Sequence, residues 1–155
     1  MLVIKHFVAR FVIPVALSAM AFSAHAMEFS KPSDAVDLRQ DQMSLIAGYF
    51  GDMGAMVKGK KPFNATQFKI DAERLADLAS WGHTGYENAS YTDSDSSALP
   101  AIWKNKAEFD RMMSQFATNA AALKTAAAGG NLKASLPAFK AVAGQCGSCH
   151  KKFRD

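Results

Sequence analysis

The amino-acid sequence predicts an all-α fold in which four helices form an antiparallel bundle. Apolar residues recur at every third or fourth position in four stretches, residues 33–50, 65–81, 101–128 and 132–154, and this period marks one buried face of a helix. No stretch shows the strict alternation that is typical of a half-buried strand. Two connections are short, so the helices that they join are expected to lie antiparallel, and the third connection is long.

The first helix is expected to begin at Ser33 and to end at Phe50. Pro32 precedes its start, and Gly51 and Gly54 are expected to stop it. The positions expected to face the core are Ala35, Leu38, Gln42, Leu45 and Tyr49, with Met43, Ile46 and Phe50 beside them.

The second helix is expected from Ala65 to Trp81, and Gly82 ends its apolar pattern. Asn64 stands three residues before Gln67, a spacing that suits a reciprocal cap between each side chain and the other residue's backbone amide. The polar stretch 82–100 has no helical period and predicts a long crossover. Three carboxylates of this helix are expected to lie on a solvated face: Asp71, Glu73 and Asp77.

The third helix is expected from Ala101 to Ala128, where Gly129 and Gly130 end it. The fourth is expected from Leu132 to Arg154, with Pro137 tolerated in its first turn. Alternating spacings of four and three define its inward seam, which comprises Leu132, Leu136, Phe139, Ala143, Cys146, His150 and Phe153.

Residues 1–26 have the pattern of a secretory signal peptide. Lys5 and Arg10 accompany a short apolar run, and Ala24-His25-Ala26 supplies the small residues of a cleavage site. Cleavage after Ala26 is expected to leave one domain, residues 27–155, in the periplasm, with no membrane segment.

The charge balance of the chain is mild. The 155 residues hold 18 Lys and Arg against 14 Asp and Glu, and removing Lys5 and Arg10 leaves 16 against 14. Nucleic-acid binding requires a dense basic patch, and the only basic cluster, at Lys58, Lys60 and Lys61, is expected to be a solvated loop. Nucleic acid is therefore not an expected partner.

Five residues near the C-terminus, Cys146-Gly147-Ser148-Cys149-His150, form the attachment pattern of c-type cytochromes. In this chemistry each thiol adds to one of two vinyl groups on the same edge of a porphyrin. A separation of three residues on a helix places both sulfur atoms on one face, and His150, four residues after Cys146, points the same way. The sequence therefore predicts one covalently attached haem c, with His150 as the iron ligand.

Other interpretations of the two cysteines fit less well. A thioredoxin-like pair occurs in a βαβ setting, and this chain has no strand pattern. A structural zinc site has four ligands, whereas two Cys and one neighbouring His are available here.

Together with the predicted signal peptide and helices, the C-terminal motif resembles the cytochrome c-prime family, the class II c-type cytochromes. The resemblance covers nearly all of the chain after residue 26. The matching residues are Lys31-Pro32, Asp34-Ala35-Val36, Arg39-Gln40, Pro100, Ile102-Trp103 and Arg154.

The resemblance implies a four-helix bundle, often a homodimer, whose haem has His150 as its single protein ligand. It implies that Arg39 and Gln40 lie near the haem propionates, that Arg154 lies near His150, and that Met43 faces the other side of the iron. Such sites bind nitric oxide and carbon monoxide, and the implied roles are gas binding and electron transfer without enzymatic turnover. The redox partner stays unknown.

Two alternatives remain open at this point. Met43 either crowds the iron without bonding it or binds it as a thioether, which would make a low-spin His/Met electron carrier. An enzyme that metabolises nitric oxide or peroxide would need an acid or base, such as His or Arg, over the iron. His83 is the candidate for that role and the other candidate for a sixth iron ligand, but in its polar loop it is expected to face solvent. Six aromatic side chains are candidates for either the haem pocket or ordinary core: Phe50, Phe68, Trp81, Trp103, Phe109 and Phe116.

Overall fold

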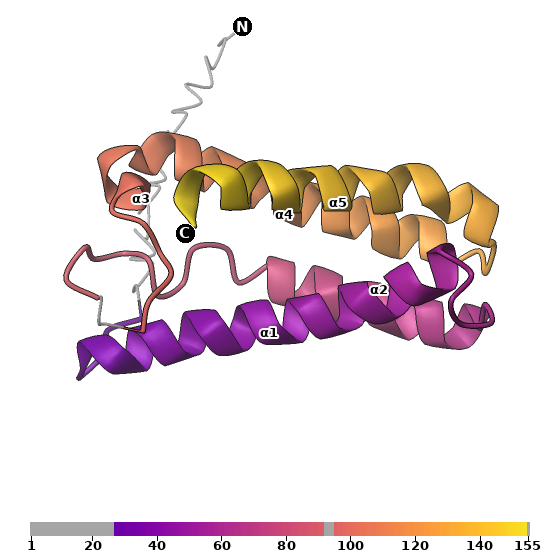
Figure 1. The fold of residues 1–155 in the computed structure, drawn as a ribbon, viewed down its shortest axis with the longest axis horizontal. Coiled ribbons are helices and arrows are strands. Elements are labelled where there is room, and N and C mark those ends of the chain that lie inside the picture. The colour runs from indigo at the N-terminus through magenta and orange to yellow at the C-terminus, as the bar shows by residue number, and fades with distance from the viewer. Residues whose placement is uncertain (1–26, 92–94, 155) are drawn as a thin grey trace, which may run out of the picture.

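A computed structural model describes residues 27–91 and 95–154, so the predicted signal peptide lies outside the described residues. Five helices follow one another along the chain: α1 (Pro32–Val57), α2 (Ala65–Ala79), α3 (Ala101–Lys104), α4 (Lys106–Ala127) and α5 (Leu132–Phe153). The four long helices run alternately in opposite directions (Figure 1). The predicted all-α antiparallel bundle is therefore confirmed.

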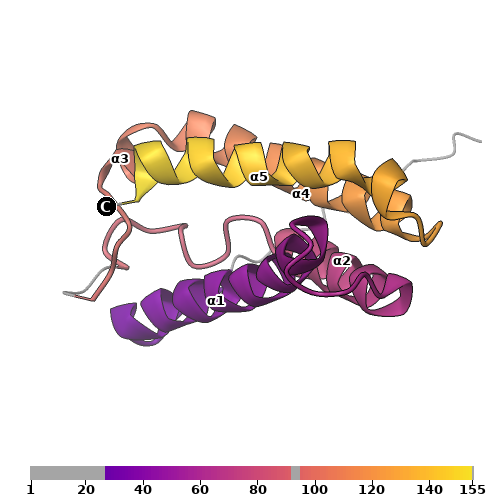
Figure 2. The ribbon, with the colours of Figure 1, turned by 45° about the vertical axis from the view of Figure 1, so that its right-hand side comes forward.

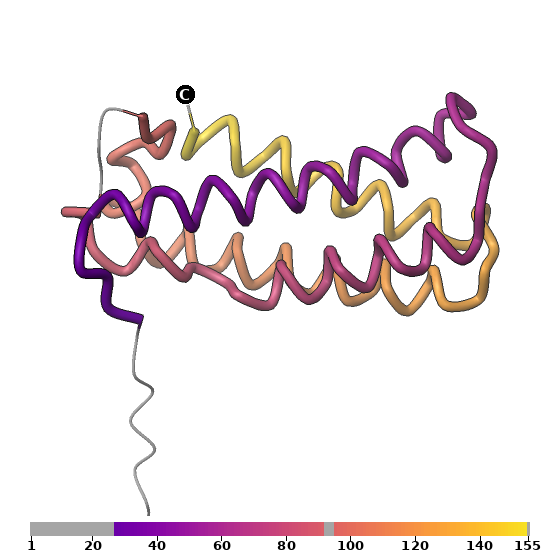
Figure 3. Tube along the Cα trace, turned by 90° about the horizontal axis from the view of Figure 1, so that it is seen from below, coloured from indigo at the N-terminus to yellow at the C-terminus, as the bar shows by residue number. Residues whose placement is uncertain are grey.

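The bundle has two layers, one formed by α1 and α2 and the other by α4 and α5. Seen from below, α1 and α2 lie in front of α5 and α4 (Figure 3). Contacts between α1 and α2 and between α4 and α5 form the two layers, and contacts between α2 and α4 join one layer to the other. At one end the rings of Phe50 and Phe139 stack with centroids 4.4 Å apart and close the fourth side, between α1 and α5. Within the described ranges, no helix combines the length and the apolar character needed to cross a membrane.

The first helix is longer than predicted, because Gly51 and Gly54 do not end it. Met53 and Met56, beyond the expected end, are completely or almost completely buried, and this burial outweighs the cost of about 1 kcal/mol for each helical glycine. The helix ends two residues before Gly59, whose φ of 67° is of the kind that terminates helices. Leu45 was expected to face the core, but it is 48% exposed.

The boundaries of α2, α3 and α4 also correct the sequence expectations. Asn64 caps α2 as predicted, since its side chain accepts a hydrogen bond of 3.0 Å from the Gln67 amide, but the Gln67 side chain turns to Asp71 instead of returning to Asn64. The expected single helix over 101–128 is interrupted at Asn105, whose ψ of 44° is not helical. Its side chain donates a hydrogen bond of 3.0 Å to the Ala101 carbonyl and competes with the helical backbone.

The last helix, α5, agrees with its predicted range to within one residue. Asn131 caps its start by accepting a hydrogen bond of 3.1 Å from the Ala134 amide, which places Pro137 in the second turn, not the first. Its inward seam is rotated from the predicted one, because Val142 is completely buried and Ala143 is exposed.

The predicted crossover between the layers is present. Residues after α2 run back between α1 and α5 at the end of the bundle where α5 finishes (Figure 2). The Leu99 amide donates a hydrogen bond of 3.0 Å to the Phe153 carbonyl, and Ala98 pairs with Arg154 in an isolated antiparallel bridge. These contacts attach the crossover to the C-terminal end of α5.

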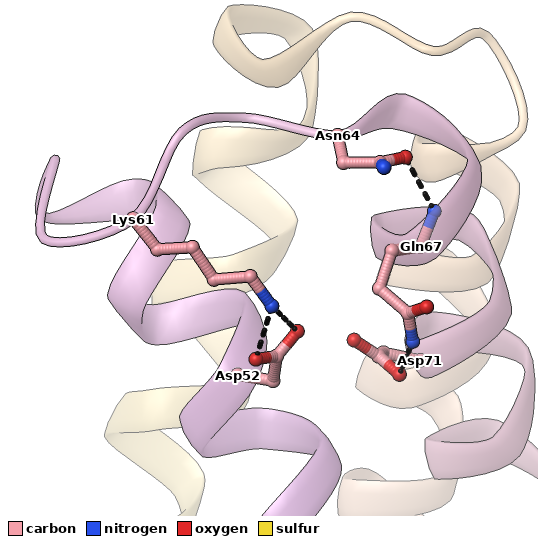
Figure 4. Close-up of polar contacts among 5 residues, drawn as sticks. All are labelled: Asp52, Lys61, Asn64, Gln67 and Asp71. Atoms are coloured by element: carbon pink, nitrogen blue, oxygen red, sulfur yellow. Dashed lines mark hydrogen bonds and ion pairs between the residues drawn. The ribbon is translucent and has the colours of Figure 1, made fainter.

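At the opposite end of the bundle, Asp71 is buried, which contradicts the expectation that it lies on a solvated face. The Asp71 residue is 1% exposed and faces Asp52 across the α1–α2 contact (Figure 4). Gln67 donates a hydrogen bond of 2.8 Å to one carboxyl oxygen, while the other oxygen accepts no hydrogen bond from any residue that the structure describes. Lys61 holds Asp52 with contacts of 2.6 and 2.9 Å.

This arrangement shifts the pKa values of the two carboxyl groups in opposite directions. Burial raises the pKa of Asp71, and the neighbouring Asp52 adds to the rise although the Gln67 hydrogen bond opposes it. The hydrogen bond from Lys61 lowers the pKa of Asp52. A proton on Asp71 would let its second oxygen donate a hydrogen bond to the Asp52 carboxylate, so we expect the two carboxyl groups to share one proton.

We expect Asp71→Asn to remove part of the pH dependence of stability, because an amide donates the same hydrogen bond without ionising. The folded pKa of Asp71 lies above the unfolded one, so its stabilising contribution is complete below the unfolded pKa and is lost as pH rises through the folded pKa. Thermal midpoints measured from about pH 4 to about pH 8 should therefore fall less steeply for Asp71→Asn than for the parent. The same change at exposed Asp77 is the control, and parallel profiles for all three proteins would contradict the shared proton.

Candidate functional site

A cleft lies between α1, from Val36 to Gly51, and the last turns of α5, and α4 bounds it behind. It consists of two adjoining cavities of about 430 and 290 Å³. Both are lined by the same six residues: Met43, Ala47, Met113, Cys149, His150 and Arg154. The cleft is thus one continuous site with two differently lined ends.

The predicted attachment motif lies on α5 at this cleft. Cys146 and Cys149 are free thiols and are half-buried, and His150 is half-buried beside them. Cys149 and His150 line both cavities, whereas Cys146 lines only the smaller one. The helix therefore presents two sulfur atoms and one imidazole to the same space, as the spacing indicates.

The cleft changes the acidity of these side chains. Burial raises the pKa of the Cys146 thiol, and burial together with Cys146 raises the pKa of Cys149. Burial lowers the pKa of His150, and the charge of Arg154 lowers it further. A neutral imidazole keeps a nitrogen lone pair, which is the form in which histidine binds a metal.

The larger cavity has a polar, basic end. Arg39, although charged, is only 3% exposed. Its guanidinium donates a hydrogen bond of 2.9 Å to the Gly85 carbonyl and one of 3.3 Å to the Ser96 hydroxyl. Gln40 lines the same end and donates a hydrogen bond of 2.8 Å to the Asp95 carbonyl. Both predicted propionate-side residues therefore lie at the cleft, where they also hold the crossover in place.

Sequence reasoning missed the part of this end that the crossover contributes. Gly85 has a φ of 84°, and a Cβ there would lie 3.0 Å from the Arg39 side chain, so the position requires glycine. The next residue, Tyr86, lies under the Arg39 guanidinium at 4.8 Å, and its carbonyl accepts a hydrogen bond of 3.1 Å from Trp103. The only sequence signal was Gly85 itself, within an irregular polar stretch.

The six aromatic side chains considered for the haem pocket are divided between the cavities, the core and the surface. The smaller cavity is mostly apolar. Phe50 and Phe116 line this cavity, and Phe109 lines the larger one. Phe68 belongs to the bundle core, whereas Trp81 is 47% exposed. Trp103 packs beside Arg39 instead of lining either cavity.

His83 lies outside the cleft, as predicted. Its side chain is half exposed, its Nδ1 atom lies 3.5 Å from an Asp110 carboxyl oxygen, and it lines neither cavity. Its position gives no support to a role as an acid or base within the cleft.

The chemistry of the cleft fits a porphyrin with two carboxylate arms. The apolar end suits a flat hydrocarbon ring, and the two thiols suit covalent attachment at one edge. At the other end, the forked donors of Arg39 suit a carboxylate. Met43, on α1, and His150, on α5, border the space from opposite layers.

A family model for cytochrome c' matches residues 34–154, which include every helix except the first two residues of α1. The chain belongs to the cytochrome c' family. Haem c, covalently attached and containing iron, is therefore the cofactor of this chain, and the resemblance inferred from the motif is confirmed.

Several relatives agree in sequence and structure with this cytochrome c' fold. Cytochrome c' from Alcaligenes xylosoxydans xylosoxydans is 35% identical over 129 residues, which cover 82% of this chain and 98% of the relative. The structure of cytochrome c prime from Shewanella frigidimarina is 41% identical, with a TM-score of 0.79 over 83% of this chain and 99% of that one. Two variants of cytochrome c prime from Alcaligenes xylosoxidans, at 34% identity, 83% and 99% coverage and a TM-score of 0.74, hold nitric oxide and carbon monoxide, respectively.

Proposed function

We propose that this cytochrome c' works in the periplasm as a mono-haem protein that binds nitric oxide or carbon monoxide and transfers electrons. Cys146 and Cys149 attach the haem, and His150 is the only protein ligand of its iron. Met43 covers the opposite side without bonding, which leaves a five-coordinate iron. The observation that carries this proposal is the placement of Met43 and His150 on opposite layers of one cleft.

The residues around the cleft have separate roles at this site. When bound, the haem supplies an iron atom that accepts one electron and takes a diatomic gas. Burial lowers the pKa of His150 and the charge of Arg154, which borders the same cleft, lowers it further, and both effects favour the neutral imidazole that binds a metal. Arg39 and Gln40 orient the carboxylate arms while they hold the crossover, so the ring and the loop are fixed by the same two side chains.

Gas binding is favoured over catalysis by the lining on the Met43 side. The other residues that α1 contributes to the smaller cavity are apolar or small: Ile46, Ala47, Phe50 and Gly51. Turnover of nitric oxide or peroxide requires a proton donor or acceptor over the iron, and His83 lines neither cavity. We therefore propose a non-enzymatic role.

An absorption spectrum of the purified protein tests the proposal. The ferrous protein should be high spin and should bind carbon monoxide without first losing a ligand, because no thioether competes for the iron. A low-spin ferrous spectrum that carbon monoxide changes only slowly would instead support the six-coordinate His/Met electron carrier.

We also propose that the protein forms a homodimer and reaches the periplasm by means of residues 1–26. The proposal of a homodimer rests on membership of the cytochrome c' family, whose members often form homodimers. Sedimentation at the mass of one chain would contradict the dimer. An N-terminal sequence of the exported protein that does not begin at Met27 would contradict the cleavage site.

A further inference from the structure

The charges of the chain are divided unevenly between its two layers. Residues 27–99, which include α1 and α2, hold seven Lys and Arg against eleven Asp and Glu. Residues 100–155, which include α4 and α5, hold nine against three. The mild net charge of the whole molecule therefore conceals an acidic layer and a basic layer, and the haem attachment helix belongs to the basic one.

On α5 the positive charges form a stripe on the solvent side. Lys133, Lys140 and Lys151 are seven and eleven residues apart, which places them on one helix face, and all three are exposed. Among the described residues, no carboxylate forms an ion pair with any of the three. Lys152, by contrast, is paired with Glu108 on α4.

Between Lys140 and Lys151 the same face has almost no side chains. Gly144, Gly147 and Ser148 are exposed there, and a Cβ added to either glycine would meet nothing within 4 Å. Cys146 and Cys149 project from the opposite side of these same helical turns into the cleft. Since a helix with its side chains is only about 10–12 Å across, on this side only the width of the helix backbone separates a docked protein from the two thiols.

We infer that this face of α5 is the docking surface for an acidic redox protein, which contacts the bare backbone at Gly144, Gly147 and Ser148 while Lys140 and Lys151 hold its carboxylates. The inference rests on the proposed function in electron transfer. The positive charge of the α5 face indicates that the partner is acidic. The exchange moves one electron, so the reduced partner leaves oxidised by one equivalent and neither a proton nor a bond is transferred. Opposite charges orient such an encounter and raise its rate.

A charge-reversal experiment with a matched control tests the surface. The probe is a plant-type [2Fe–2S] ferredoxin, an acidic protein that carries one electron. Binding is measured by calorimetry with both proteins oxidised, so that no electron moves, and the reduction rate is measured separately by stopped flow. Lys140→Glu with Lys151→Glu should weaken binding by about tenfold or more and slow reduction similarly. Lys60→Glu with Lys69→Glu makes the same change in net charge on the other layer and should alter both quantities by less than about threefold.

The bare backbone is tested by Gly144→Leu, which adds a side chain without changing charge and favours the helix. Reduction by ferredoxin should slow severalfold, because the partner is held farther away. Equal effects of the two charge reversals would overturn the docking surface, and an unchanged rate in Gly144→Leu would overturn the backbone contact. The absorption spectrum and carbon monoxide binding should be unchanged in all variants, so a failed docking surface is distinguishable from a failed assignment of the haem ligands.

Discussion

Replacing both Cys146 and Cys149 with alanine is expected to yield a protein without covalent haem and without a rigid bundle. The reason is the cleft itself. Its two cavities of about 430 and 290 Å³ separate α1 from α5 at one end of the molecule, where few other contacts join these helices. A group that fills such a space contributes to folding as well as to function.

The loss is measurable by two methods. Acid–acetone extraction should leave haem on the parent polypeptide and none on the double variant. Circular dichroism should show a thermal midpoint lowered by roughly 15 °C or more, which corresponds to about 4 kcal/mol for a domain of this size. Ser148→Ala, within the same motif but without a thiol, should retain both haem and stability.

Two outcomes would count against this account. Extraction of haem from the parent would show that the attachment is not covalent. A double variant with native-like helix content and a sharp transition near that of the parent would show that the bundle organises itself without the cofactor.

Met43→Ala is expected to accelerate carbon monoxide binding by about tenfold or more, since lowering a steric barrier by ~1.4 kcal/mol changes a rate tenfold. Met43 is half-buried, packs against two groups of buried apolar side chains, one that includes Ile46 and one that includes Met113, and borders both cavities. Its truncation opens the space opposite His150. Flash photolysis or stopped flow of the ferrous protein measures the rate.

The control for this change is Leu45→Ala, two residues away on the same helix but exposed to solvent. It should leave the rate unchanged. A ferric band near ~695 nm and a low-spin ferrous spectrum, both present in the parent and absent from Met43→Ala, would show that the thioether binds the iron. The protein would then be a dedicated electron carrier.

The bundle and its heme motif could be predicted because both depend on short-range periodicity. The spacing of apolar residues along α2 and α5 indicated helices with nearly correct boundaries, and Asn64 was identified as a cap from its own chemistry. The errors arose where burial outweighs local preference. Gly51 and Gly54 are poor helix residues, but α1 continues through them because Met53 and Met56 find a core. Asp71 resembled a solvated carboxylate because the sequence does not show that Asp52 lies beside it in the fold.

By itself the sequence determined the helical class, the C-terminal attachment motif and, through their resemblance to a family, the cofactor. Its motif residues lie within one turn of one another, so their relation is set by helix geometry alone. The resemblance also implied that Met43 lies opposite His150, and the tertiary structure places both residues at one cleft. Only the tertiary structure decided that Gly85 and Tyr86 support the Arg39 side chain, and that Asp52 and Asp71 meet. These residues are separated by many positions along the chain, and the packing of whole helices, which no local pattern specifies, brings them together.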